Sequence, residues 1–232
     1  MPAAIFYSPH ADDETLSMGV GIRNHIVAGY DVYVILLSHG RASNAYNVLA
    51  GTQYCSWHAK YHNPSSEGYA PFDKRKFGLT RVNEFINACL ALGVPYSNIA
   101  VYDLEDGQFT KDQVKAIIQE WVNRVPGAGH KTMTYKDNHP DHVACGQALL
   151  ELYNAGIIGN ARFYIKREQY DQINGFFETY DSSYYPYIQA AANVYKNWAP
   201  TQGKLAVGYH SVKSTFDALL SDPRSKLHRP NE

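Results

Sequence analysis

The sequence lacks any apolar run long enough to cross a membrane, and it carries almost no net charge. Its 232 residues include 21 basic and 22 acidic side chains, for a formal charge of −1, so no basic field favours nucleic acid or an anionic membrane surface. The apolar stretch at residues 3–8 is too short for the core of a signal peptide. We therefore expect no nucleic-acid partner, no membrane insertion and a cytoplasmic location.

Cysteine is also scarce. Cys55, Cys89 and Cys145 are odd in number and form no CxxC pair, which argues against a disulfide scaffold and favours a reducing compartment. Tyrosine, in contrast, is abundant, with 19 residues. Because tyrosine combines an apolar ring with a hydroxyl group, these side chains either form surfaces for ring-shaped ligands such as sugars or pack around the core. Composition leaves the oligomeric state open.

Short apolar segments alternate with longer segments of helical periodicity. Strands are expected at residues 3–8, 31–38, 98–104, 131–135, 161–167 and 205–209. Helices are expected at residues 14–28, 75–92, 111–124, 142–154, 184–198 and 212–220. This alternation predicts an α/β, Rossmann-like fold with a mostly parallel β-sheet flanked by helices and an active site at the C-terminal strand ends. No linker or repeat divides residues 1–232, so we expect one domain.

Two polar, aromatic stretches interrupt the alternation, at residues 39–74 and 168–187. Connections as long as the first are usually functional loops or contain an unrecognised element. We expect both stretches to border a ligand cleft. Within the first, Trp57, His58 and His62 suit either substrate contact or packing of the loop.

The densest group of reactive side chains is SPHADDETLSMG at residues 8–19. His10 follows the first expected strand, and Asp13 stands at the start of the next helix, so a short turn can direct both at one point. A second motif, NHPDH at residues 138–142, follows the strand expected at 131–135, which places both motifs on one edge of a doubly wound sheet. Two histidines, one carboxylate and an open position form a catalytic zinc arrangement, in which the pKa of bound water falls to roughly 7.

PHADDE near the N-terminus, combined with HPDH in the middle of the chain, resembles the PIG-L/LmbE family of zinc-dependent de-N-acetylases over most of residues 3–155. The resemblance implies a metal-dependent hydrolase that removes an N-acetyl group from an N-acetylglucosamine-containing or related amino-sugar conjugate. It implies His10, Asp13 and His142 as ligands of Zn²⁺, and Fe²⁺ or Co²⁺ could occupy the same three residues.

The resemblance also implies roles for other residues. Asp12 would be the general base, His139 the general acid or the group that stabilises the oxyanion, and Asp141 the residue that orients His139. Arg81, which leads RVNEFINACLALGV, and Asp106, in DLEDG, would contact substrate. The chain after about residue 160 matches the family poorly, so the resemblance does not identify the substrate.

Two other functions remain open at this point. His10, Asp12 and His142 also satisfy the HxD…H pattern of non-haem Fe(II) oxygenases, although those enzymes usually have β-rich folds. The chain could also be a non-catalytic sugar-binding relative.

Individual residues have structural interpretations too. Glu14 could favour the first turn of a helix or support a metal ligand, because an acid there complements the helix dipole. Arg81 could pair with Glu84 on the helix surface, and Asp141 could cap the helix that follows it.

Overall fold

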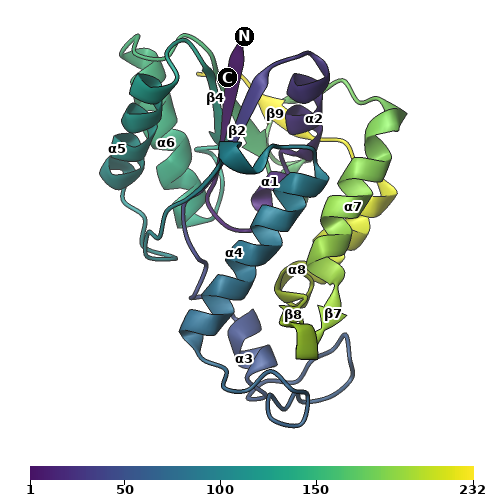
Figure 1. Cartoon of the computed structure of the whole chain (residues 1–232). Coiled ribbons are helices and arrows are strands. Elements are labelled where there is room, and N and C mark those ends of the chain that lie inside the picture. Colours follow the sequence, from purple (N-terminus) through teal and green to yellow (C-terminus); the bar gives the residue numbers. More distant parts are fainter.

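A computed structural model describes residues 1–232 and contains a central seven-stranded sheet (Figure 1). The strand order is β3-β2-β1-β4-β5-β9-β6. The first five strands of the chain pair in parallel, and β9 and β6 add antiparallel strands beyond β5. The strands of this sheet are β1 (Ala3–Ser8), β2 (Asp31–Leu36), β3 (Ile99–Val101), β4 (Gly129–Met133), β5 (Ala161–Ile165), β6 (Phe176–Phe177) and β9 (Lys226–His228). The predicted α/β fold with a mostly parallel sheet is confirmed.

Helices cover both faces of the sheet. They are α1 (Asp13–Leu16), α2 (Gly19–Val27), α3 (Ala45–Leu49), α4 (Lys74–Ala91), α5 (Lys111–Arg124), α6 (Pro140–Asn154), α7 (Tyr185–Lys196) and α8 (Val207–Ser221). Alternate residues of β1 serve the two faces: Ala4 and Phe6 pack with α2, α4, α7 and α8, whereas Ile5 and Tyr7 pack with α5 and α6. Figure 1 shows these two layers on opposite sides of the sheet.

The predicted strand at 205–209 is wrong. Only Lys204–Leu205 is extended, as β8, and it pairs with β7 (Trp198–Ala199) in a separate two-stranded sheet. The residues that follow begin α8, where the backbone N–H groups of Val207 and Gly208 donate to the buried carboxylate of Glu84 at 2.7 and 3.0 Å. A short apolar run is compatible with either a strand or a buried helix, and here a distant acid stabilises the helix start.

Other boundaries differ as well. The helix expected at 14–28 is divided into α1 and α2 at residues 17–18, and the stretch at 39–74 contains the short helix α3. Gly21 in α2 lies so close to the Tyr164 hydroxyl that a Cβ atom could not be accommodated, which explains a glycine within a helix. None of the helices combines the length and the hydrophobicity that a bilayer-spanning segment needs.

The strand order reverses between β1 and β4, because β2 and β3 lie on one side of β1 while β5 lies beyond β4. At such a switch point the connections leave the two strands in opposite directions and open a crevice at their carboxyl ends. The loops after β1 and β4 carry the two histidine motifs, so the fold brings them together there.

Candidate active site

A cavity of about 610 Å³ lies at this edge of the sheet. Seven of the eight predicted site residues line it: His10, Asp12, Asp13, Arg81, Asp106, His139 and His142. The eighth, Asp141, is fully buried behind His10. Only three of the 21 lining residues are hydrophobic, so the cavity suits a ligand with many polar groups.

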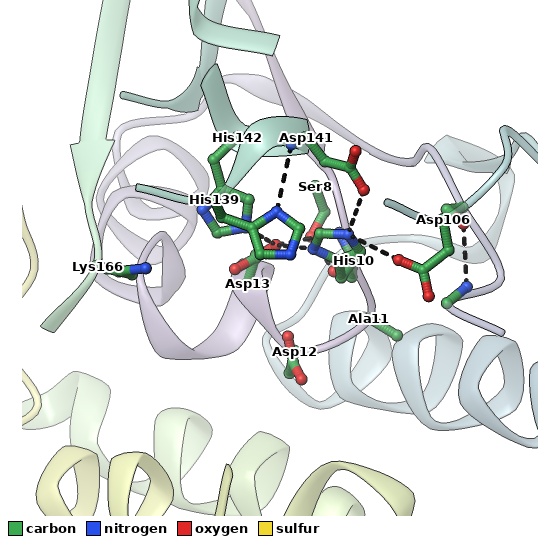
Figure 2. Close-up of polar contacts among 12 residues, drawn as sticks. Ser8, His10, Ala11, Asp12, Asp13, Asp106, His139, Asp141, His142 and Lys166 are labelled. Atoms are coloured by element: carbon green, nitrogen blue, oxygen red, sulfur yellow. Dashed lines mark hydrogen bonds and ion pairs between the residues drawn. The ribbon is translucent and has the colours of Figure 1, made fainter. Parts of the chain in front are cut away.

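The three predicted metal ligands converge in this cavity (Figure 2). Oδ2 of Asp13 lies 3.2 Å from Nε2 of His142 and 3.5 Å from Nδ1 of His10. Ligand atoms of a tetrahedral ion with metal–nitrogen distances near 2.1 Å are separated by about 3.3 Å. Two imidazoles and one carboxylate at this spacing fit a divalent metal, and one ring nitrogen of His139 lies within 4.8 Å of nitrogens of the other two rings.

Electrostatics hold Asp13 in its charged form. Burial alone would raise the pKa of its carboxyl group, but His142 and His10 hold that pKa well below its ordinary value. The backbone N–H of His10 also donates to Asp13 Oδ2 at 3.0 Å. An anionic oxygen is therefore fixed between the two imidazoles, as a metal ligand requires.

Two carboxylates contact the Nε2 side of the His10 ring. Its Nε2 lies 3.0 Å from Oδ2 of Asp141 and 3.3 Å from Oδ1 of Asp106, which leaves Nδ1 facing Asp13. Asp141 also accepts the backbone N–H groups of Gly107 and Phe109 at 2.8 and 3.1 Å, so it connects the loop after β3 to His10. Partners of this kind fix the tautomer and orientation of a ligating histidine.

This geometry corrects the prediction that the Asp141 carboxylate orients His139. That carboxylate contacts His10, and only the backbone N–H of Asp141 reaches His139, where it donates to Nδ1 at 3.3 Å. His139 itself is the N-cap of α6, so the alternative of Asp141 as the cap is also wrong. Asp106, expected to contact substrate, instead holds His10 and accepts the Ala42 N–H at 2.7 Å while still bordering the cavity.

Asp137 is a further acid of the candidate site, and the sequence analysis missed it. Its Oδ2 lies 3.0 Å from Nδ1 of His142, and its Oδ1 accepts the His139 N–H at 2.8 Å and pairs with Nζ of Lys166 at 2.9 Å. Burial would raise the pKa of this carboxyl group, but His142 and Lys166 lower it to about 2. An acid four residues after the end of β4, and five residues before a candidate ligand, was the available signal.

Asp12 sits in an unusual backbone conformation, with φ at 128°, a region that residues other than glycine rarely adopt. Its N–H donates to Oε2 of Glu14 at 3.0 Å. Glu14 is fully buried and accepts from the hydroxyls of Thr15 at 2.7 Å and Tyr195 at 2.6 Å. Glu14 therefore supports the turn that separates the directions of Asp12 and Asp13, rather than serving only the helix dipole.

Figure 2 shows the Asp12 carboxylate apart from the ligand cluster. It lies 3.5 Å from a guanidinium nitrogen of Arg81. Burial raises the pKa of Asp12 to about 7, with Arg81 opposing the rise. Arg81 donates to the carbonyl oxygens of Ala11 at 2.9 Å and Gly40 at 3.2 Å, so it braces the turn as well as bordering the cavity. Its predicted alternative pairing with Glu84 is wrong, because that acid binds the start of α8.

The long connections border the cavity through mostly polar residues. Ala42 and Ser43 come from the first stretch, and Glu168, Gln169 and Gln172 from the second. No tyrosine lines the cavity, so the first of the two alternatives for the tyrosines, a surface for a ring-shaped ligand, does not apply to this cavity. Trp57, His58 and His62 also lie outside the cavity.

Solved structures share this fold. Teicoplanin deacetylase in a zinc-inhibited form aligns with a TM-score of 0.65 and 16% identity, covering 99% of each chain. N,N'-diacetylchitobiose deacetylase from Pyrococcus horikoshii aligns with a TM-score of 0.62 and 13% identity, covering 98% of this chain and 84% of that one. A 4-carboxy-2-hydroxymuconate hydratase from Pseudomonas putida also aligns, with a TM-score of 0.59, 16% identity and coverage of 98% and 95%. At these identities the likeness establishes the fold alone.

Sequence comparison is more specific. No curated protein sequence matches the chain significantly. A family model described as PIG-L, GlcNAc-PI de-N-acetylase, matches residues 5–153, a span that includes both histidine motifs and all eight predicted site residues. The chain belongs to the PIG-L family of de-N-acetylases.

Proposed function

We propose that the chain hydrolyses the N-acetyl group of an N-acetylglucosamine-containing or related amino-sugar substrate, with zinc held by His10, Asp13 and His142. Family membership makes it an N-deacetylase, which cleaves an amide bond. The observation that carries the proposal is the position of Asp13 Oδ2 between the two imidazoles, with a second buried acid, Asp12, beside it and outside the ligand set. The polar lining of the cavity suits a hydroxyl-rich sugar.

The same observation disfavours the oxygenase arrangement. That ligand set requires the Asp12 carboxylate to join His10 and His142, but the oxygen that lies between these rings belongs to Asp13. The Asp12 carboxylate instead faces Arg81.

When bound, the metal would polarise the amide carbonyl and make hydroxide available at neutral pH. In this proposal Asp12 accepts the proton of the attacking water, which is supported by its position in the cavity lining beside Arg81. The proton accepted by Asp12 can then pass to the amine nitrogen as the amide C–N bond breaks, so that acetate and a free amine leave. General base catalysis of this kind typically contributes about 10²- to 10⁴-fold.

His139 has the properties of a hydrogen-bond donor to the oxyanion. Burial, together with the neighbouring His10 and His142, lowers its pKa, which favours the neutral ring. Because its Nδ1 accepts the Asp141 N–H, the neutral ring carries its proton on Nε2. A neutral donor can stabilise the charge that develops on the carbonyl oxygen.

The substrate class is tested by measuring acetate release from N-acetylglucosamine, N,N'-diacetylchitobiose and N-acetylglucosamine conjugates. Each substrate is assayed with the protein as purified, after treatment with a chelator, and after zinc is restored. We expect release from at least one amino sugar, loss of activity with chelator and recovery with zinc. Absence of release from the whole panel would overturn the substrate class, and turnover that resists the chelator would overturn the metal mechanism.

The roles of the adjacent acids are tested with Asp12→Asn. The variant should retain the metal content of the wild type but lose about 10²- to 10⁴-fold in kcat, because only the base is removed. Asp13→Asn is the matched comparison and should lose metal. If Asp12→Asn loses metal instead, the division of roles between the two acids is wrong.

A further inference from the structure

A second cluster of potential metal ligands lies outside the cavity, between the 39–74 connection and the start of α8. Ligand atoms of Cys55, His58, His62 and His210 all lie within 4.8 Å of one another. The first three come from a C-x₂-H-x₃-H segment, and the fourth is 148 residues further along the chain. None of them lines the candidate active site.

Three of the six separations among these atoms are close to the edges of a tetrahedron around a metal ion. Nε2 of His62 lies 3.3 Å from Nδ1 of His58 and 3.2 Å from Nε2 of His210, while Sγ of Cys55 lies 3.8 Å from Nδ1 of His58. Tetrahedral zinc, with Zn–N near 2.0–2.1 Å and Zn–S near 2.3 Å, requires edges of about 3.3 Å between nitrogens and about 3.6 Å between sulfur and nitrogen.

The hydrogen bonds at Nδ1 of His62 and His210 determine where the lone pairs of these two rings point. Nδ1 of His62 lies 2.8 Å from Oε2 of Glu67, and Nδ1 of His210 lies 2.8 Å from the Ala206 carbonyl oxygen. Both partners are acceptors, so both Nδ1 atoms carry protons, and in the neutral rings both Nε2 atoms present lone pairs. Two lone pairs facing each other at 3.2 Å repel, and a cation between them removes that repulsion.

A backbone N–H group and aromatic rings surround the cluster. The backbone N–H of His58 donates to Cys55 Sγ at 3.3 Å, which fixes the position of the sulfur beside the His58 ring. Cys55 and His62 are buried, and the rings of Trp57 and Trp198 pack against the cluster, with centroids 4.1 Å from His58 and 4.9 Å from His62.

We propose that Cys55, His58, His62 and His210 form a second zinc site, structural rather than catalytic, that fastens the 39–74 connection to α8. All four positions are filled by protein side chains, so the site leaves no position for water or substrate. Glu67 acts as the outer carboxylate of His62. The site also reaches the candidate active site indirectly, because Ser211 and Val212, which follow His210, line that cavity.

This proposal predicts two zinc ions per chain. The protein is stripped with a strong chelator, reconstituted with excess zinc and desalted, and its metal content is then measured by mass spectrometry. Cys55→Ala and His210→Ala should each retain one equivalent, as should Asp13→Ala, which removes a ligand at the other site. Cys89→Ala, which removes a different buried thiol, should retain two. Two equivalents in Cys55→Ala, or a single wild-type equivalent that Cys55→Ala keeps and Asp13→Ala loses, would overturn the proposal.

Cobalt provides a readout that does not depend on how well a variant folds. Only the second site contains a thiolate, so the Co²⁺-loaded wild type should show a thiolate-to-cobalt charge-transfer band in the near ultraviolet. The band should persist in Asp13→Ala, where the proposed active-site metal is lost. Its absence from the wild type at two cobalt equivalents would show that Cys55 is not a ligand.

Discussion

Replacement of Asp137 by asparagine should weaken zinc binding at the active site and reduce turnover, although Asp137 is not itself a proposed ligand. Its carboxylate accepts the Nδ1 proton of His142, which leaves Nε2 of that ring free to face Asp13. Asparagine keeps the size of the side chain but removes the charge, and it leaves Lys166 without its buried anionic partner.

The magnitude follows from how strongly the site favours the charged carboxylate. The pKa of Asp137 falls from 3.8 to about 2, because His142 and Lys166 outweigh the opposing effect of burial. This difference in pKa corresponds to about 2–3 kcal/mol, or a factor of about 60 in an equilibrium constant. Loss of an outer partner of a metal-bound histidine generally costs about 10- to 100-fold, so both arguments agree on the expected loss.

The assay should report the active-site metal alone. Acetate release by chelator-stripped protein is titrated against buffered free zinc, which gives the zinc affinity from the midpoint and kcat from the plateau. Lys166→Met is the matched comparison: it removes the ion pair but leaves the contact between Asp137 and His142, so its midpoint should stay near that of the wild type. If Asp137→Asn showed the midpoint and plateau of the wild type, the assigned role of this carboxylate would be refuted.

Three further changes test the framework around the site. Burial lowers the pKa of His130 in the folded protein to about 4, whereas its pKa in the unfolded chain is near 6.5. Between these two pH values the unfolded chain binds more protons, so the free energy of unfolding falls as the pH drops. From pH 7 to pH 5, denaturant titrations of His130→Gln should show about 2 kcal/mol less loss of unfolding free energy than the wild type, and equal losses would contradict this. Gly146→Ala should lower stability by about 1–3 kcal/mol, because the added methyl group would collide with the backbone just after β4. Gly159→Ala, where the added methyl group meets open space, should have little effect. Similar thermal midpoints for the two variants would argue against the close approach of α6 to that backbone. Tyr195→Phe removes a hydroxyl that donates to buried Glu14 at 2.6 Å and should lower the unfolding free energy by about 1.5–3 kcal/mol, so an unchanged value in urea titrations would rule out that contribution.

The sequence predicts the position of the site well because local geometry determines it. A strand that ends at Ser8 and a helix that starts at Asp13 leave a turn that can direct both His10 and Asp13 at one point. The HPDH motif opens α6 after a parallel neighbour of β1, so the sheet brings His142 to the same edge. These inferences require only strand order and the polarity of parallel strands.

The partners of those residues could not be read from the sequence. Asp141 was expected to orient the adjacent His139, but its carboxylate bonds to His10, 131 residues away, and to the loop after β3. Proximity along the chain is a poor guide at a helix start, where neighbouring side chains point in different directions. The error at 205–209 has a similar origin, since Glu84 from α4 stabilises a helix start there that the local apolar run does not predict.

The two candidate metal centres have the same hydrogen-bond arrangement around their histidines, at different positions in the fold. At the active site, Asp141 and Asp137 hold the outer nitrogens of His10 and His142, so that the inner nitrogens converge on Asp13.

At the second centre, Glu67 and the Ala206 carbonyl hold the outer nitrogens of His62 and His210 in the same way. Each acceptor fixes a proton on one side of a ring and therefore a lone pair on the other. Histidine spacing alone identifies candidate ligands. Convergence of the nitrogen lone pairs is what distinguishes a metal site from a packed cluster of rings. That convergence depends on hydrogen-bond acceptors supplied by distant parts of the chain. The centres differ in the remaining position: three protein ligands leave the first open to water and substrate, and four close the second.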